Sequence, residues 1–262
     1  IYSSLQYGAL YKSYDGGLTS FEALSGIDKQ EKRNWNTPIL FDSENPDYLY
    51  YGTTRVYQST DGATTWLPVS PILTKVAATN GSSYGTITSI ATANSKPDLM
   101  YVGTDDGQVW QGEVNDTSTW QNIGADLPKR WVSQIAVDPN NHLSVYVCFS
   151  GYRFHDYVPH VFYSDNGGDT WQDISSNLPE APVNDIVLND SVPNALFVAT
   201  DVGVFKSDNK GDTWEMLGAN LPNVPITDIV LHHENQLLIA ATYGRSMYRC
   251  SVANLNVTGG KE

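Results

Sequence analysis

Short runs of alternating apolar and polar residues, interrupted by Gly, Asn, Asp and Pro, follow one another along the chain. Runs of this length and period, rich in Val, Ile, Tyr and Thr, predict antiparallel strands joined by tight turns. The runs also recur in a fixed order. A first strand precedes a second one that ends in a Gly-Thr or Ala-Thr step, as at 52–53, 103–104 and 199–200, and a third and a fourth follow. The pattern therefore predicts an all-β chain built from four-stranded units.

A short motif recurs between the third and the fourth predicted strand. It reads S-x-[DN]-x-[GA]-x-T-W in three copies, a looser copy ends on Phe21, and a degraded copy has Glu113 in place of the serine. The terminal aromatic residues lie at positions 21, 66, 120, 171 and 214. Their mean step of about 48 residues is typical of β-propeller blades rather than of helical solenoids.

The recurring side chains of this motif are predicted to be structural. The carboxylate or amide at the third position can accept backbone N–H bonds, and glycine at the fifth allows a positive φ. The tryptophan is expected to pack between neighbouring blades. A catalytic role is disfavoured because the same acid recurs in blade after blade. The residues assigned this role are Ser13, Asp15, Gly17, Ser59, Asp61, Trp66, Asn115, Trp120, Ser164, Asn166, Gly168, Trp171, Ser207, Asn209, Gly211 and Trp214.

Counting strands divides one propeller region, 1–262, into four complete and two partial blades. The first partial blade supplies a second to a fourth strand, and the last supplies a first to a third with no motif after it. The two overlap on their middle strands and cannot merge into one blade. The complete blades are expected at about 36–70, 84–124, 131–175 and 183–218, and the partial ones at 1–24 and 226–252, before a tail at 253–262.

This count predicts a piece of a six- to eight-bladed parent, since propellers have about four to eight blades. Open strand edges are a liability for a folded protein, because they pair readily with other chains. We therefore expect the remainder of the propeller, a missing N-terminal segment or a second chain, as a partner.

The motif resembles the Asp-box, or BNR, repeat of sialidases, sortilin-type propellers and family 74 xyloglucanases. The chain as a whole looks closest to the sortilin-like and photosystem-assembly-factor-like propellers of secreted bacterial proteins. Segments 34–38, 84–88, 102–107 and 221–225 carry this resemblance, which covers nearly all 262 residues. It implies an extracellular or cell-surface location. Its motifs are specific for the fold but not for the function, because unrelated activities share this scaffold.

Charge and composition exclude several classes of partner and cofactor. The formal net charge of −14 disfavours binding to nucleic acid. No apolar run has the length needed for membrane insertion. Cys148 and Cys250 form neither a disulfide framework nor a C-x-x-C pair. No cofactor is expected. The acidic turn 42–47 could hold structural calcium, but no EF-hand spacing supports such a site.

Candidate binding residues lie on loops that, in propellers, surround one mouth of the central channel. Aromatic and arginine side chains gathered there could bind a glycan by stacking or a peptide by hydrogen bonds. In an equally weighted structural interpretation, Trp35 and Trp131 plug the channel and Arg130 caps a carbonyl. The candidates are Arg33, Trp35, Arg55, Asp105, Arg130, Trp131, Tyr152, Arg153, His155, Asp201, Tyr243 and Arg245.

The longest insertion, 151–160, separates two strands of its blade and carries His155, Asp156 and His160. A long aromatic loop on a rigid scaffold is a reasonable place for function. These three side chains are weak support for a metal, and solvated loop residues are the favoured interpretation.

Enzymatic function is disfavoured but kept as the alternative. A sialidase needs three clustered arginines, and the Arg-Ile-Pro element of that family is absent from this sequence. Family 74 hydrolysis needs two carboxylates across a glycan cleft, and no catalytic motif can be placed. The prediction is a non-enzymatic binding or scaffolding propeller of a secreted or cell-surface protein, which engages a protein or glycan at one mouth of the channel. The alternative is a sialidase-like or xyloglucanase-like glycoside hydrolase with part of its active site in a missing N-terminal segment.

Overall fold

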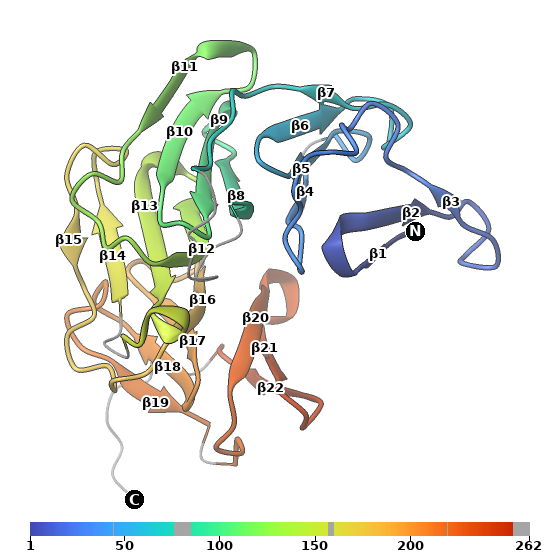
Figure 1. Ribbon diagram of the computed structural model, residues 1–262. Helices are drawn as coiled ribbons and strands as arrows, with labels where there is room; N and C mark the ends of the chain where they lie inside the picture. The colour runs from blue at the N-terminus through green and yellow to red at the C-terminus, as the bar shows by residue number, and fades with distance from the viewer. Residues whose placement is uncertain (44, 76–84, 157–159, 219, 254–262) are drawn as a thin grey trace, which may run out of the picture. The chain divides into compact units, whose positions relative to one another are not determined.

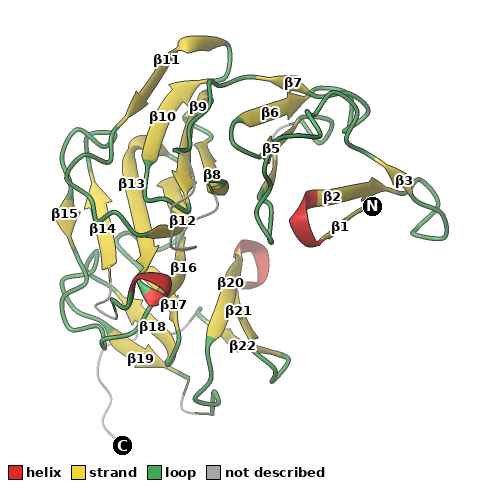
Figure 2. Cartoon of the chain, viewed as in Figure 1, coloured by secondary structure: helices red, strands yellow, loops and turns green. Residues whose placement is uncertain are grey.

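The computed structural model describes residues 1–43, 45–75, 85–156, 160–218 and 220–253 (Figure 1). The prediction of an all-β chain is confirmed, since these residues form antiparallel strands and only short 3-10 turns (Figure 2). No helix in these ranges is long and apolar enough to span a membrane. The predicted tail after residue 253 and the start of the blade at 84 lie outside the described residues.

The strands form six antiparallel sheets, of which four have four strands and the first and last have three. The chain divides into two compact units, unit 1 at 1–142 and unit 2 at 143–262. Unit 1 contains the sheets β1 (Tyr2–Leu5), β2 (Ala9–Lys12) and β3 (Phe21–Glu22); β4 (Ile39–Phe41), β5 (Leu49–Gly52), β6 (Val56–Ser59) and β7 (Leu67–Pro68); and β8 (Ile87–Ala93), β9 (Lys96–Thr104), β10 (Val109–Glu113) and β11 (Asp116–Asn122).

The next sheet comprises β12 (Trp131–Asp138), β13 (Asn141–Ser150), β14 (His160–Ser164) and β15 (Gln172–Asp173), and the boundary between the units falls inside β13. The remaining sheets of unit 2 are β16 (Val183–Leu188), β17 (Leu196–Thr200), β18 (Gly203–Ser207) and β19 (Glu215–Leu217), then β20 (Ile226–His232), β21 (Leu237–Thr242) and β22 (Met247–Ser251). The 3-10 turns are Gln6–Gly8, Tyr152–Phe154 and His233–Asn235.

The second strand of each complete sheet carries the core. Every residue of β5 and of β17 is buried, because these strands are covered on both faces. A strand buried on both sides reads as a continuous apolar run rather than an alternating one, as Leu-Phe-Val-Ala-Thr does in β17.

The turn between the third and the fourth strand closes with side-chain hydrogen bonds that span only four residues. The Ser59 hydroxyl donates to Asp61 Oδ1 at 2.8 Å and accepts the Ala63 N–H at 2.8 Å. Asp61 Oδ1 also accepts the Thr65 N–H at 2.8 Å. The same three bonds recur in the turns that begin at Ser13, Ser164 and Ser207.

The fourth and fifth residues of this turn adopt a positive φ, as in Gly167 and Gly168. This conformation is open to glycine at no steric cost. Ala63 adopts it at φ 66° in the turn that begins at Ser59.

The copy at 113–120 departs from the expected turn. Val114 and Asn115 form a two-residue connection, and Glu113 pairs with Asp116 across it. The carboxylate that accepts here is that of Asp116, which receives the Ser118 N–H at 2.9 Å. The sequence predicted Asn115 as the hydrogen-bond acceptor of this turn, but in the structure the acceptor is Asp116. The reason is that Glu113 cannot supply the short hydroxyl that closes the longer turn.

The tryptophans that follow these turns pack on the preceding sheet of their unit. Trp66, Trp120 and Trp214 are buried, as predicted. Their indole Nε1 atoms donate to the carbonyls of Ala23 at 2.9 Å, Val69 at 3.1 Å and Ile174 at 2.9 Å.

The predicted burial of Trp171 is wrong, because this residue is only half-buried.

Candidate functional site

The buried acid among the candidates of unit 1 has a structural role. Asp105 is completely buried and accepts the N–H groups of Gly85 at 3.0 Å and Thr86 at 2.9 Å. The Thr86 hydroxyl donates to its second oxygen at 3.0 Å and accepts from Asn34 Nδ2 at 2.8 Å. A carboxylate with these partners holds two loops together rather than a ligand.

Arg55 is also engaged within the protein. Its Nε lies 2.7 Å from Glu31 Oε1, and the Thr53 hydroxyl donates to the other oxygen of the same carboxylate. Both charged side chains are largely covered, so the pair is geometrically fixed. Arg55 therefore orders the loop before the third strand of its sheet, and it is not an available ligand group.

Trp35 lies on the surface, in contact with an aromatic residue that sequence reasoning missed. Its side chain is 57% exposed, and that of Tyr7 is 62% exposed. The two rings form an edge-to-face pair with centroids 5.1 Å apart, and the Tyr7 N–H donates to the Trp35 carbonyl at 3.1 Å. The interpretation of Trp35 as a buried plug is therefore wrong. In the sequence, only the position of Tyr7 before Gly8 could have indicated a tight turn here. In the structure Tyr7 adopts φ 59° in that turn.

Arg33 lies beside this pair. A Cβ placed on Gly8 would meet Arg33 Cδ at 2.9 Å, so the arginine packs on the same turn as Tyr7. The Tyr51 hydroxyl donates to the Gly8 carbonyl from below. Burial raises the pKa of Tyr51 to about 12, although the charge of Arg33 acts in the opposite direction. We call the exposed rings of Tyr7 and Trp35, together with the half-buried Arg33, the aromatic surface.

Arg130 and Trp131 are two further candidates of unit 1. Both are half-buried at the start of β12. The guanidinium of Arg130 donates to the Lys129 carbonyl at 3.1 Å, which is the capping role of the structural interpretation.

The candidates of unit 2 lie on exposed loops. Tyr152, Arg153 and His155 are exposed on and just after a 3-10 turn, and Tyr243 and Arg245 are exposed in the β21–β22 connection. Their exposure leaves these side chains accessible to a ligand. Asp201 instead accepts a hydrogen bond from Asn184 Nδ2 at 2.9 Å.

The insertion 151–160 shows one ionisable contact, between His160 Nε2 and Asp156 Oδ2 at 3.2 Å. Residues 157–159 lie outside the described part of the chain. Within that part, no three His, Cys, Asp or Glu side chains gather as metal ligands would.

Two aspartates of unit 2 form a contact that the sequence did not reveal. Asp185 is buried at an irregularity of β16 and accepts the Ile186 N–H at 2.7 Å and the Ile229 N–H at 2.8 Å. Asp228 lies beside it in β20. Loss of water around the Asp228 carboxyl raises its pKa, while the hydrogen bond with Asp185 acts in the opposite direction. Asp228 is otherwise an exposed residue.

The aspartates of the repeated turns have the opposite shift. The hydrogen bonds from Thr65 and Thr19 lower the pKa of Asp61 and of Asp15 to about 2. A carboxyl group with so low a pKa stays ionised and cannot act as a general acid near neutral pH.

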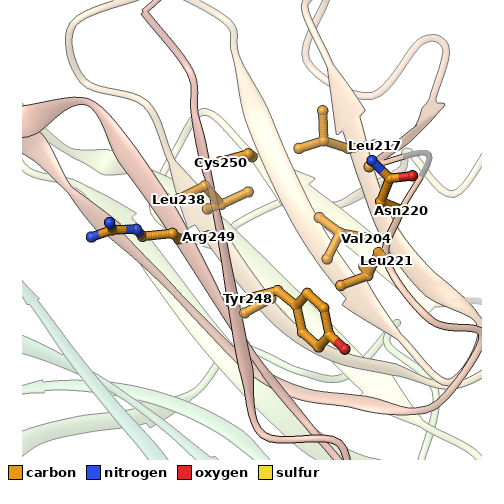
Figure 3. A pocket seen from close by; sticks show the side chains of 10 residues that line it. Val204, Leu217, Asn220, Leu221, Leu238, Tyr248, Arg249 and Cys250 are labelled. Carbon is orange, nitrogen blue, oxygen red and sulfur yellow. The ribbon is translucent and has the colours of Figure 1, made fainter.

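A cavity of about 280 Å³ lies between the last two sheets of unit 2. The side chains of Leu217 and Leu221 face those of Leu238 and Cys250 across it (Figure 3). Its lining is mostly apolar, with Arg249 and Asn220 at the margin. We call this cavity the slot. Its sequence signal was the missing motif and tryptophan after the strand that ends near Val252.

No family model matches this chain. No curated protein matches it either.

Solved structures do resemble it. The β-propeller domain of Swd1 from Myceliophteria thermophila has a TM-score of 0.63 and 15% identity, with 86% of this chain and 68% of that chain covered. YCF48 bound to a D1 peptide gives 0.62 and 13%, with 93% and 71% covered. An ancestral GH74 enzyme gives 0.63 and 16%, with 96% of this chain but only 36% of that enzyme covered. At these identities the likeness shows the fold alone, which is that of β-propellers.

Proposed function

We propose that this chain is a non-enzymatic binding or scaffolding region of a β-propeller, in a secreted or cell-surface protein. Its repeated turns are Asp-box turns in this proposal. Its three-stranded first and last sheets are blades of a six- to eight-bladed parent, completed by strands from another segment. The ligand is a protein segment that docks on the aromatic surface of Tyr7, Arg33 and Trp35.

The observation that carries this proposal is the exposure of the Tyr7–Trp35 pair. Two large rings that are more than half exposed leave apolar area in water. The edge-to-face contact and the backbone hydrogen bond between them hold both rings in place before any ligand arrives. Fixed aromatic residues next to an arginine are the residue types that dominate protein interfaces, because little side-chain freedom is lost on binding.

The acidic residues support a binding role over catalysis. The Asp105 carboxylate already accepts three hydrogen bonds from residues 85 and 86. Asp15 and Asp61 are held ionised by their own turns. A glycoside hydrolase needs one carboxylic acid that keeps its proton near neutral pH, and none of these three meets that need.

The similar structures are consistent with this proposal. YCF48 was solved with a D1 peptide bound, which makes a peptide ligand a reasonable one for a propeller of this kind. At 13% identity the likeness to YCF48 indicates a shared fold but not a shared ligand. The ligand is therefore proposed from the aromatic surface of this chain.

The test is a peptide array and a glycan array probed with the full chain. We expect peptide binding that Trp35→Ala weakens at least tenfold and that Tyr14→Ala leaves unchanged. Tyr14 is the matched control, because it is an exposed aromatic residue outside the aromatic surface. Binding that survives Trp35→Ala would contradict the assigned surface. Binding to glycans alone would contradict the protein ligand.

The alternative is a glycoside hydrolase that shares its active site with another segment. The candidate acid of this alternative is Asp228, because loss of water around its carboxyl raises its pKa. We expect no turnover of aryl-glycoside, sialoside or xyloglucan substrates by this chain. Hydrolysis that Asp228→Asn abolishes would establish the alternative instead.

A further inference from the structure

Four contacts between consecutive sheets can be compared, and three of them contain a tryptophan. In each of these three, the fourth strand of the later sheet brings an indole onto the earlier sheet, where it donates to a backbone carbonyl. The fourth contact joins the sheet β16–β19 to the sheet β20–β22. The later sheet has three strands there and brings no tryptophan. The slot lies at this contact.

The walls of the slot match the walls around Trp120. On the earlier sheet, Val56 and Val69 are joined by a backbone hydrogen bond of 2.9 Å, and the corresponding residues Val204 and Leu217 are paired strand partners. Four residues after Val69 comes Leu73, which packs in the same cluster as Trp120. Four residues after Leu217 comes Leu221, which lines the slot.

The wall on the later sheet matches as well. Met100 pairs with Gly112 beside Trp120, and Leu238 pairs with Cys250 beside the slot. A Cβ added to Gly112 would meet the Trp120 ring at 2.3 Å, which shows how closely the indole covers this position. Cys250 still leaves room for a ring. Ser59, of similar size, occupies the same register in a sheet that contains Trp66.

The slot is therefore shaped for an indole. Its volume of about 280 Å³ is well above the roughly 150 Å³ of a cavity that binds benzene. The carbonyl of Leu217 stands where the carbonyls of Val69 and Ile174 accept an indole N–H.

The free edge of β22 shows how the indole would arrive. β22 is the last strand of its sheet, so its outer backbone groups can pair with an added strand. In the preceding sheet, Lys206 lies opposite Glu215, the residue directly after Trp214. Arg249 holds the register of Lys206, because each lies two residues beyond the partner of the alanine in the Ala-Thr step of the central strand. These partners are Val204, opposite Ala199, and Met247, opposite Ala241. An acidic residue after the tryptophan would therefore face Arg249.

We propose that the slot and the edge of β22 bind one antiparallel strand of a partner polypeptide, in which a tryptophan is followed by an acidic residue. Residues 253–262 contain no aromatic side chain, so they do not supply the tryptophan. The ring enters the slot and donates to the Leu217 carbonyl, the acidic residue faces Arg249, and the backbone extends the sheet. The inference rests on the proposed completion of the last sheet by a strand from another segment. Its residues differ from those of the aromatic surface, so its failure can be told apart from failure of the ligand proposed there.

Cys250 gives a direct readout of the slot. It is partly exposed there, whereas the other cysteine, Cys148, is completely buried. The probe is a synthetic peptide with the sequence of residues 212–221, which carries Trp followed by Glu. We expect it to slow alkylation of Cys250 by iodoacetamide at least tenfold in the full chain, measured by intact mass. The same peptide with Ala in place of Trp should give no protection.

A charge exchange tests the register without disturbing the core. Arg249 is exposed, so Arg249→Glu should weaken protection by the Trp-Glu peptide and restore it for a Trp-Lys peptide. Arg245→Glu, an exposed arginine of the same unit outside the slot, is the matched control and should change neither.

Equal protection by the Trp and Ala peptides would overturn the indole assignment. Protection that rises with the concentration of the chain alone would assign the slot to a second copy and overturn the separate partner. In the Trp35→Ala variant we expect full protection, which separates this site from the aromatic surface.

Discussion

Two contacts between consecutive sheets have similar walls but different contents. Between the sheets β4–β7 and β8–β11, the indole of Trp120 lies inside, donates to Val69 and belongs to a buried cluster. Between the sheets β16–β19 and β20–β22, the equivalent space is the slot. The comparison shows that three strands suffice to build the walls. The fourth strand is needed only to bring the ring that fills the space between them.

The leucines that line the two spaces differ in how far they are buried. Leu73 is 1% exposed beside Trp120, whereas its counterpart Leu221 is only half-buried beside the slot. The Leu73 N–H donates to the Thr54 carbonyl and the Leu221 N–H to the Gly218 carbonyl, each at 2.9 Å. The two loops are therefore fixed by different partners, although the leucines hold corresponding positions beside the two spaces.

The largest effect is expected from deleting a ring that fills its contact. Trp66→Ala should lower the free energy of unfolding by about 3–5 kcal/mol, the usual range for a buried aromatic residue. Trp171→Ala should cost about half as much, because Trp171 is only half-buried. Chemical denaturation of both variants measures the difference. Equal losses would show that the degree of burial does not decide how much a ring contributes to stability.

Truncating the leucines that line the two spaces should also destabilise the protein more at the filled space than at the slot. Leu73→Ala removes a fully buried side chain next to Trp120 and should cost about 2–4 kcal/mol. Leu221→Ala removes a side chain that already borders open space, and it should cost about 1 kcal/mol or less. Urea midpoints at constant m-value give the two numbers. If Leu221→Ala proves as damaging as Leu73→Ala, the slot is closed in solution.

The next largest effect on stability is expected from the turn that precedes each tryptophan. Ser59→Ala removes the hydroxyl that accepts the Ala63 N–H and leaves that buried donor without its partner. A buried donor left unsatisfied costs about 1–3 kcal/mol. Cys250 holds the same register in the sheet that has no such turn, so Cys250→Ala is the control and should change stability little. A comparable loss in the control would contradict the importance of the turn.

The smallest effect is one of pH. The pKa of Asp61 is lowered to about 2 in the fold, chiefly by the Thr65 hydroxyl. A lowered pKa gives stability that is fully present above the unfolded value and is lost as the pH falls through the folded one. Between pH 4 and about pH 2, the wild-type protein should therefore lose stability relative to Asp61→Asn. Asparagine preserves the turn, since Asn166 and Asn209 donate to the threonine hydroxyls at 2.9 Å.

Thermal unfolding of both proteins across this pH range checks the prediction. Asn209→Asp is the reverse control, and it should introduce the acid sensitivity that Asp61→Asn removes. Parallel pH profiles for all three proteins would show that the shift of Asp61 has no influence on folding.

The local features of the fold could be predicted from the sequence because their causes lie close together in the chain. In the turns at Ser13, Ser59, Ser164 and Ser207, every hydrogen bond that closes the turn spans four residues or fewer. Strand alternation and Gly-Thr steps are local in the same way. The six sheets and the all-β class follow from these signals, and the structure agrees with them.

Features that depend on distant partners were decided by the tertiary structure. Trp171 carries the same motif as Trp66, yet it is only half-buried. Asp105 looks like a ligand residue in the sequence, yet the backbone N–H groups that hold it come from about 20 residues away. Tyr7 was missed because its contact with Trp35 crosses 28 positions of the chain.

The sequence by itself thus determined the strands, the repeated turns and the residues that close them, because each of these is stabilised within one repeat. Only the tertiary structure decided which rings are buried, which carboxylates accept hydrogen bonds from distant backbone groups and where the slot lies. The physical reason is that burial and desolvation depend on the packing of one sheet on the next. In Asp185, a polar group of β16 is satisfied by the Ile229 N–H of β20, 44 residues further along the chain.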